Sequence, residues 1–165
     1  MRPEELAVRL QGRVPDVTVA RGETTLVVDR TQLPAVLEEL RTDGELAFDF
    51  LSSVTATDWP GRVPRYWVSY ELGSTRHHHR LRVKVGLAED DARLPSVTSL
   101  FPTADWHERE TFDLYGIVFD DHPHLSRILL PDGWEGHPLR KTEELGGVDT
   151  RYKGAFVPPV DRRTT

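Results

Sequence analysis

Apolar and polar positions along the first 118 residues follow the two periods of regular secondary structure. Apolar residues spaced three and four positions apart predict helices at residues 4–10, 33–40 and 104–115. The second of these segments is the most clearly amphipathic, and Thr31 stands before it as the expected N-cap. These helices are expected to bury one face each against a common core.

Alternation of apolar and polar residues predicts strands between and after the first two helices. Residues 17–20 and 24–29 flank Arg21-Gly22-Glu23, which is typical of a hairpin turn. Further strands are expected at residues 46–57, 66–72 and 81–87. The pattern predicts an α+β fold, with one mixed or antiparallel sheet covered by a helical layer.

The pattern changes after residue 118. The last 47 residues contain ten Pro and Gly, and no helical or strand period persists through them. The segment nevertheless carries large apolar side chains, such as Leu129, Trp134 and Phe156, so its composition differs from that of autonomous disorder. We therefore divide the chain into a globular domain, residues 1–118, and an extended Pro/Gly-rich C-terminal arm, residues 119–165. The arm must pack either on its own domain or on a partner protein.

Composition removes several classes of function. The 165 residues contain no cysteine, which excludes disulfides, cysteine-ligated iron–sulfur clusters and thiolate zinc sites. The formal net charge of −6 is unlike the basic footprint of nucleic-acid-binding proteins. No apolar run approaches the length of a membrane span, and the first ten residues lack the apolar core of a secretory signal.

Residues 108–141, which we call the signature segment, contain the densest set of chemically capable side chains. Glu108, Glu110, Asp113 and His122 allow a hypothesis of acid/base catalysis by paired carboxylates and a histidine. The alternative is a structural charge network with arginines. Its cations would be Arg127 and Arg140, and Arg109 is spaced to pair along the helix with Asp105 and Asp113.

The histidines do not predict a metal site. His122 and His124 are separated by one residue and a third, His137, is distant, which is a weak ligand pattern. His77 to His79 are consecutive, so on a strand they would face alternate sides and could not converge. We interpret residues 77–79 as a solvated hairpin tip. Glycine-rich phosphate-binding motifs and the G-x-S-x-G nucleophile motif are absent.

The signature segment closely resembles that of a core peripheral-arm subunit of respiratory NADH–quinone oxidoreductase, the subunit lettered C in the complex I family. The resemblance extends over 34 residues without a gap. It is carried by Glu108-Arg109-Glu110, Asp113-Leu114-Tyr115-Gly116-Ile117, Phe119, His122-Pro123, Leu125, Arg127-Ile128-Leu129, Pro131, Trp134-Glu135-Gly136 and Pro138-Leu139-Arg140-Lys141. Two positions depart from the family pattern, Ser126, where a basic residue is more usual, and Thr142, where Asp is usual.

The resemblance implies a structural, non-catalytic subunit of the hydrophilic arm of a proton-pumping enzyme. The complex would transfer electrons from NADH through FMN and Fe–S clusters, held by partner subunits, to quinone. This chain would hold no cofactor or metal and would have no autonomous activity. It would dock on the quinone-site subunit and the cluster-bearing subunit, peripheral to the cell membrane on its cytoplasmic side. A membrane-bound hydrogenase or related dehydrogenase has an equivalent subunit, which is the alternative.

The resemblance also implies which residues form the subunit interface or support it. These are Glu108, Arg109, Glu110, Asp113, Tyr115, Gly116, His122, Pro123, Arg127, Pro131, Trp134, Pro138, Arg140 and Lys141. Arginine and tryptophan commonly dominate the energetics of protein interfaces.

Overall fold

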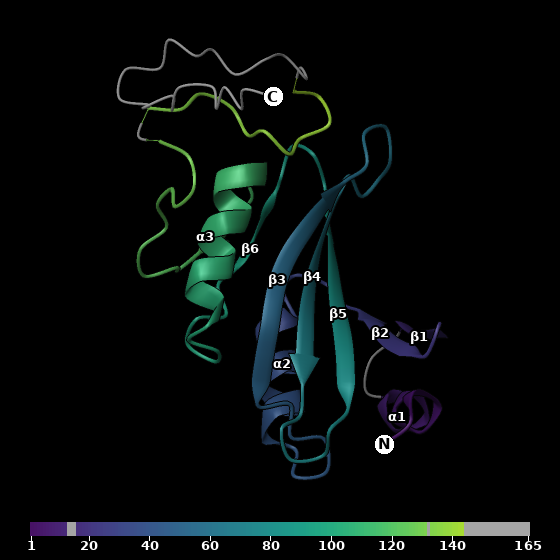
Figure 1. Cartoon of the computed structure of the whole chain (residues 1–165). Helices are drawn as coiled ribbons and strands as arrows, with labels where there is room; N and C mark the ends of the chain where they lie inside the picture. Colours follow the sequence, from purple (N-terminus) through teal and green to yellow (C-terminus); the bar gives the residue numbers. More distant parts are fainter. Residues whose placement is uncertain (13–15, 132, 144–165) are drawn as a thin grey trace, which may run out of the picture.

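A five-stranded sheet is the base on which the other elements of the computed structural model are arranged (Figure 1). The structure describes residues 1–12, 16–131 and 133–143. In these ranges the elements are α1 (Pro3–Leu10), β1 (Asp16–Ala20), β2 (Glu23–Val27), α2 (Leu33–Thr42), β3 (Phe50–Asp58), β4 (Tyr66–Gly73), β5 (Arg80–Leu87), β6 (Arg93–Pro95), α3 (Ala104–Tyr115) and β7 (Val118–Asp120). The α+β class and the three helices predicted from the sequence are confirmed.

The large sheet is mixed, with strand order β1-β2-β5-β4-β3. β3, β4 and β5 form an antiparallel meander, β1 and β2 form a hairpin, and β2 joins the meander by pairing parallel to β5. Arg21 and Gly22 connect the hairpin with φ angles of 54° and 76°. Two consecutive positive φ angles are the geometry of a tight type I′ turn, and Gly22 adopts its positive φ angle without strain.

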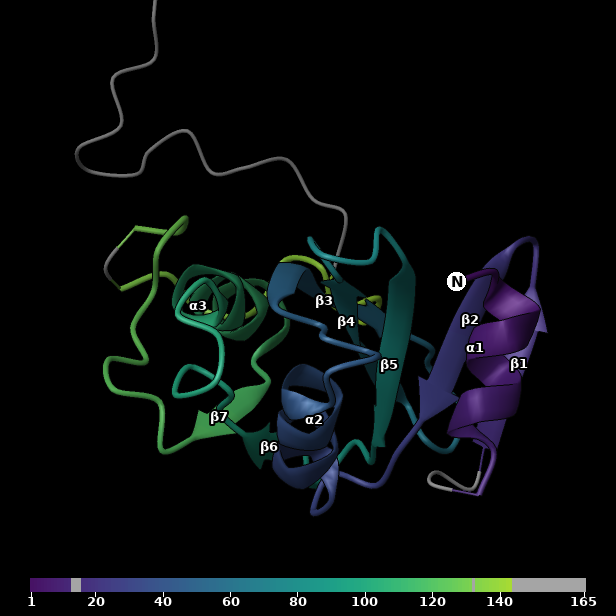
Figure 2. The same ribbon diagram turned by 90° about the horizontal axis from the view of Figure 1, so that it is seen from below.

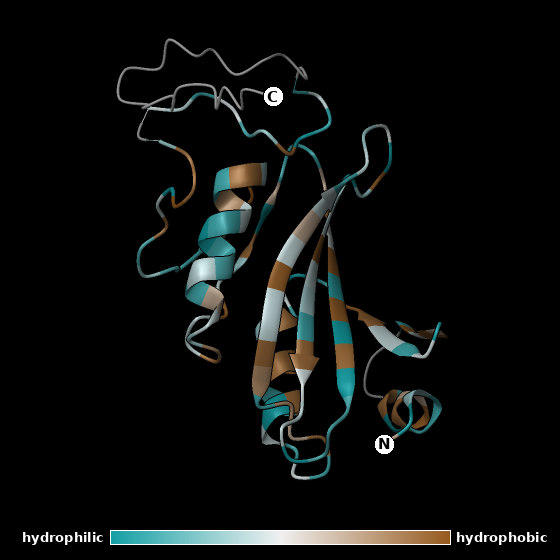
Figure 3. Cartoon of the chain, viewed as in Figure 1, coloured by the Kyte–Doolittle hydropathy of each residue, from teal (hydrophilic) through white to brown (hydrophobic). Residues whose placement is uncertain are grey.

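One face of the sheet carries the core. Buried and partly exposed residues alternate along β4 and β5, and Figure 3 shows the matching hydrophobic and hydrophilic bands on β5. The buried positions of the strands share a cluster with Leu33, Leu37 and Leu40 of α2, which confirms the amphipathic face expected there.

The outer helices lie beside opposite edges of the sheet (Figure 2). α1 contacts the β1–β2 hairpin, where the Thr24 hydroxyl donates to the Pro3 carbonyl at 2.9 Å. α3 packs along β3, and the hydroxyls of Thr103 and Thr111 donate to the Leu51 and Val54 carbonyls at 3.2 and 3.4 Å. α3 thereby supplies donors to the edge strand of the sheet, which limits further strand pairing there. In the part of the chain described, no helix is long and apolar enough to span a bilayer.

Two local predictions around α2 are wrong. Gln32, not Thr31, is the N-cap, because the Thr31 hydroxyl donates to the Asp29 carboxylate at 2.6 Å instead. The strand expected from residue 46 begins at Phe50. Asp43 draws residues 45–47 into a turn, since its side chain and carbonyl accept their backbone amides, and this turn displaces the start of the strand.

A second, two-stranded sheet was not predicted. β6 precedes α3 in the sequence and β7 follows it, and the two strands pair in parallel. Arg93 forms an ion pair with Asp120 across this small sheet. Each strand has only three residues, which is too short to show alternation. The proposed boundary after residue 118 falls inside β7. Of the arm, residues 119–131 and 133–143 are described, whereas the remainder, including Phe156, lies outside the described residues.

The interpretation of residues 77–79 as a solvated tip is wrong for His79. Of the three histidines only His78 is exposed, whereas His79 is buried and its Nε2 donates to the Leu46 carbonyl at 2.7 Å. Burial lowers the pKa of His79, which favours the neutral ring. The loop between β4 and β5 therefore holds the turn after α2 in place.

Candidate functional site

The signature segment consists of α3, β7 and an irregular stretch that returns along the helix. α3 ends at Gly116, which has a φ of 70° and whose amide donates to the Phe112 carbonyl at 2.8 Å. Glycine at this position adopts the left-handed conformation that terminates many helices. The chain can then turn back, so that the described residues between 122 and 140 return to α3 and contact it through side chains and backbone.

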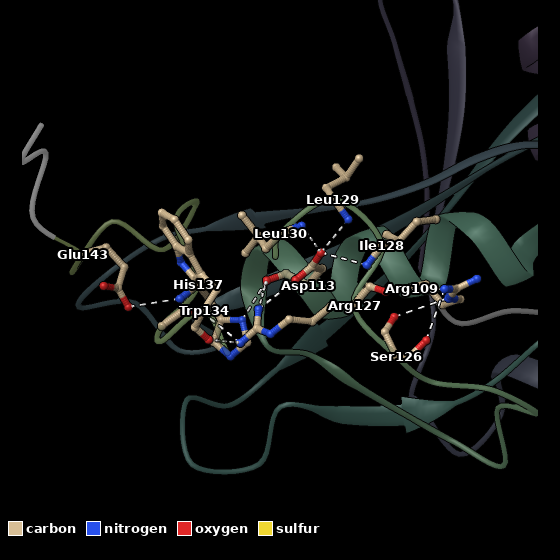
Figure 4. A network of polar contacts seen from close by, with 11 residues as sticks. Arg109, Asp113, Ser126, Arg127, Ile128, Leu129, Leu130, Trp134, His137 and Glu143 are labelled. Atoms are coloured by element: carbon tan, nitrogen blue, oxygen red, sulfur yellow. Dashed lines mark hydrogen bonds and ion pairs between the residues drawn. The ribbon is translucent and has the colours of Figure 1, made fainter. Parts of the chain in front are cut away.

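Asp113 holds the returning stretch. Its Oδ2 accepts hydrogen bonds from three consecutive backbone amides, those of residues 128–130, at 2.8–3.0 Å (Figure 4). Its Oδ1 accepts from Arg127 at 2.7 Å. Burial by itself raises the pKa of Asp113, but the three amides and Arg127 outweigh it and hold the pKa below its usual value. Asp113 is therefore a buried, ionised anchor.

Arg127 extends this anchor to the next turn of the chain. One guanidinium nitrogen donates to Asp113, and the other donates to the Trp134 carbonyl at 2.9 Å (Figure 4). The predicted network joining Asp113 to Arg127 is thus present. The guanidinium is turned inward, so Arg127 stabilises the shape of the segment from within.

The end of α3 is closed by residues of the returning stretch. The last carbonyls of a helix find no donor within the helix and require donors from outside it. His137 Nδ1 donates to the Asp113 carbonyl at 2.9 Å, and the Leu139 amide donates to the Leu114 carbonyl at 3.1 Å. Arg140 Nε donates to the Tyr115 carbonyl at 2.6 Å. Three successive carbonyls are therefore capped from 24 or more residues downstream.

Arg109 does not make the helical ion pairs expected from its spacing. Its guanidinium donates to the carbonyl and hydroxyl of Ser126 at 3.3 and 3.1 Å, and it lies 5.2 Å from the centre of the exposed Trp106 ring. Asp113 is unavailable because it is already saturated by the donors described above. Ser126, one of the two departures from the family pattern, is thus a direct partner of Arg109.

Glu108 and His122 form a second buried contact between α3 and the returning stretch. Both side chains have 0% exposure, and His122 Nε2 lies 3.9 Å from Glu108 Oε2. Glu108 accepts from the Ser96 hydroxyl at 2.7 Å and the Val97 amide at 2.8 Å. Burial nevertheless dominates and raises the pKa of Glu108 to about 7. His122 Nδ1 accepts the His124 amide at 3.0 Å, so the neutral ring carries its hydrogen on Nε2.

This geometry does not assemble the residues of the acid/base hypothesis. Glu108 and His122 are sealed from solvent, whereas Glu110 is exposed on the other side of α3. Among the described residues, no group of three or more His, Cys, Asp or Glu side chains is arranged to hold a metal ion. The polar groups of the signature segment instead support the backbone around α3.

A buried ion pair that the sequence did not reveal fixes the far end of the described segment. Arg65 Nε and Nη2 donate to the two oxygens of Asp58 at 2.7 and 2.9 Å, and the side chains are 5% and 0% exposed. Asp58 also accepts the Lys141 amide at 2.8 Å, and Arg65 donates to the Thr142 hydroxyl at 3.2 Å. The sequence did not single out Asp58, because Arg65 lies seven residues away, just before β4, and the Lys141 amide is 83 residues away.

The residues implied as interface differ in exposure. The side chains of Glu108, Asp113 and His122 are buried. Partly exposed residues are Arg109, Tyr115, Gly116, Arg127, Trp134 and Arg140. The exposed members are Glu110, Pro123, Pro131, Pro138 and Lys141. Exposed apolar side chains that are not among the implied interface residues lie beside them, notably Trp106, Leu129 and Leu139 at 61%, 60% and 43% exposure. The segment therefore has an inner, structural layer and an outer layer that is free to contact other molecules.

Fold and site together define an α+β domain whose last helix carries a long irregular segment, fixed by buried charges. Its family follows from comparison with known proteins. The family described as respiratory-chain NADH dehydrogenase, 30 Kd subunit, matches residues 26–149, and the chain belongs to this family. The resemblance noted in the sequence is confirmed.

Curated relatives are similar over most of this chain, and they carry the name of the NADH-quinone oxidoreductase subunit lettered C. The relative from Saccharopolyspora erythraea is 47% identical over 163 residues, which cover 96% of this chain and 66% of that protein. The relative from Salinispora tropica is 46% identical over 151 residues, covering 91% of this chain and 62% of that protein. The chain thus spans slightly less than two thirds of the length of these relatives.

Two solved structures share the fold. A trypsin-resistant fragment of Nqo5 matches with a TM-score of 0.64 and 31% identity over 74% of this chain and 98% of the fragment. A chain of the archaeal membrane-bound sulfane sulfur reductase matches with a TM-score of 0.73 at 23% identity, over 86% of this chain and 85% of that one. The second similarity concerns the fold alone.

Proposed function

We propose that this chain is a structural subunit of the hydrophilic arm of an NADH–quinone oxidoreductase and has no redox chemistry of its own. The observation that carries the proposal is the two-layered signature segment. Its charged residues, led by Asp113, are used to hold an irregular backbone, which leaves apolar side chains such as Leu129 outside. A monomer gains nothing from fixing an irregular, partly apolar surface, whereas a docking subunit needs one.

The redox groups would belong to neighbouring subunits. The sequence has no cysteine to ligate an Fe–S cluster, which supports the assignment of the clusters, and with them FMN, to partners. We propose docking on the quinone-site subunit and the cluster-bearing subunit beside it, as family membership suggests. Attachment to the cytoplasmic side of the cell membrane would then be made through the assembly.

Co-purification tests the proposal. The chain is tagged at its N-terminus in its native host, membranes are solubilised gently, and the recovered proteins are identified by mass spectrometry. Recovery of flavin- and cluster-bearing NADH dehydrogenase subunits is the expected outcome. Recovery with a nickel–iron hydrogenase large subunit would instead assign the chain to the sibling assembly, and a chain recovered alone would overturn the structural role.

A further inference from the structure

The loop between β3 and β4, residues 59–64, exposes apolar side chains where nothing in the described chain covers them. Val63 is 95% exposed and Trp59 is 46% exposed. Figure 1 shows the loop at the end of the sheet where the described arm also lies, opposite to α1. The residues that carry the family resemblance do not include this loop.

The loop is held in a defined shape. The Trp59 amide donates to the Arg65 carbonyl at 2.9 Å, and the Arg62 amide donates to the Trp59 carbonyl at 3.1 Å. The indole Nε1 donates to the Thr57 hydroxyl at 3.2 Å, and the Arg62 guanidinium lies 4.7 Å from the centre of the indole ring. A loop with these restraints loses little conformational freedom when it binds.

The same buried ion pair positions the loop and the arm. Asp58 and Arg65 stand at the two ends of the loop, and together they bind Lys141 and Thr142 of the arm. The exposed Leu139 belongs to the same stretch of chain. The loop and residues 139–142 therefore form neighbouring parts of one fixed surface, although the residues that join them are 77 and 83 positions apart in the sequence.

We propose that Trp59, Arg62 and Val63, together with Leu139 and Lys141, form a composite docking surface for the partner subunit that the arm contacts. This inference rests on the proposed function. The occupant is a protein surface with an apolar recess bordered by carboxylates. The apolar recess of the partner accommodates the side chains of Val63 and Trp59. Its carboxylates pair with Arg62 and Lys141.

Charge indicates this kind of partner. In the described residues no carboxylate is seen to pair with the side chain of Arg62 or Lys141, whereas the neighbouring Arg65 is paired with both Asp58 and Glu89. An anionic membrane is a poorer match, because adsorption to a lipid surface usually requires a cluster of about four or more cations and the chain carries a net charge of −6.

The test is the co-purification experiment repeated with V63E. We expect V63E to lower the recovery of the partner subunit about tenfold, as for a central interface residue. V8E is the matched control, because Val8 is 68% exposed on α1 at the opposite end of the sheet and should leave recovery unchanged. Equal thermal midpoints of the two purified variants and the wild-type chain confirm that folding is not the cause.

Three outcomes separate the possibilities. Wild-type recovery with V63E would overturn the composite surface while leaving the proposed function intact. Failure of the wild-type chain to recover any partner would overturn the proposed function itself. Binding of the wild-type chain, but not V63E, to phosphatidylglycerol vesicles, with unchanged partner recovery, would assign the loop to the membrane and also overturn the proposal.

Discussion

Glu108 and Asp113 lie about one and a half turns apart on the same helix, yet their environments act in opposite directions. Glu108 has two hydrogen-bond donors and no arginine or lysine partner, so burial dominates and raises its pKa to about 7. Asp113 has three amides and a guanidinium, which outweigh its burial and keep its pKa low. The balance between burial and hydrogen-bond donors at each carboxylate therefore sets the direction of its pKa shift.

Glu108 should make the stability of the chain fall as pH rises. The folded state retains the Glu108 proton up to about pH 7, whereas the unfolded chain releases it near pH 4.5. The stabilisation is complete below pH 4.5 and is lost as pH rises through 7. For a pKa shift of this size the free energy of unfolding falls by about 3 kcal/mol in total. In E108Q this loss should disappear, because an amide satisfies Ser96 and Val97 without ionising.

Urea denaturation of both proteins between about pH 4.5 and 8 measures this effect. E110Q is the control, since Glu110 is exposed on the same helix and should retain the wild-type pH profile. An E108Q profile parallel to that of the wild type would show that Glu108 does not retain its proton in the folded state.

Asp113 should have the opposite pH dependence. Its stabilisation is present above its unfolded pKa, near 3.8, and is lost as pH falls through the lower folded value. D113N removes the anion but leaves Arg127 and the three amides without it. We therefore expect the free energy of unfolding to fall by about 3 kcal/mol. Hydrogen exchange at residues 128–130 should accelerate strongly in D113N. Unchanged protection there would mean that these amides do not depend on the carboxylate.

The end of α3 can be tested at the level of the element. A Cβ at Gly116 would lie 2.4 Å from Arg140 Nη2 and 2.5 Å from His137 Nε2, and it would have to adopt a φ of 70°. We expect G116A to lower the free energy of unfolding by about 2 kcal/mol, of which roughly 1–2 kcal/mol comes from the left-handed backbone alone. The collision should also release the capping side chains, which accelerates hydrogen exchange at residues 137–140.

G133A separates the two contributions. Gly133 has a φ of 82°, but a Cβ there would meet no atom within 4 Å. G133A should therefore lower the thermal midpoint through backbone strain and leave exchange at residues 137–140 as in the wild type. Equal exchange in both variants would exclude a role for Gly116 in packing the returning stretch.

Elements with a repeated local signal could be predicted from the sequence, and elements defined by distant partners could not. The spacing of the leucines in α2 predicts a helix, and the alternation of apolar and polar residues in β4 and β5 predicts strands. β6 and β7 are three residues each and exist only because α3 brings them together. The same holds in the site, where Asp113 was recognised as important but its partners, the amides of residues 128–130, carry no side-chain signal.

On the scale of the whole molecule, the outer layer of the signature segment should control assembly without affecting stability. Leu129 is 60% exposed, although its amide is bound by Asp113. L129D should therefore retain the backbone contact and the thermal midpoint of the wild type. If this layer contacts a partner, recovery of partner subunits should fall about tenfold.

V8E again supplies the comparison, because it adds a charge at an exposed apolar position far from the signature segment. Full recovery with L129D would place the contact elsewhere on the chain. A lower thermal midpoint would show that Leu129 supports the fold, and the variant would then report on stability rather than on docking.

The capping of α3 from downstream has a consequence for synthesis of the chain. The carbonyls of Asp113 and Tyr115 receive their donors from His137 and Arg140, which the ribosome adds 24 and 25 residues later. The large sheet is complete in sequence at Leu87, so it can form well before the helix end is closed. A nascent chain that stops short of His137 therefore exposes an open helix terminus, which is the kind of locally unfolded site at which quality-control proteases begin.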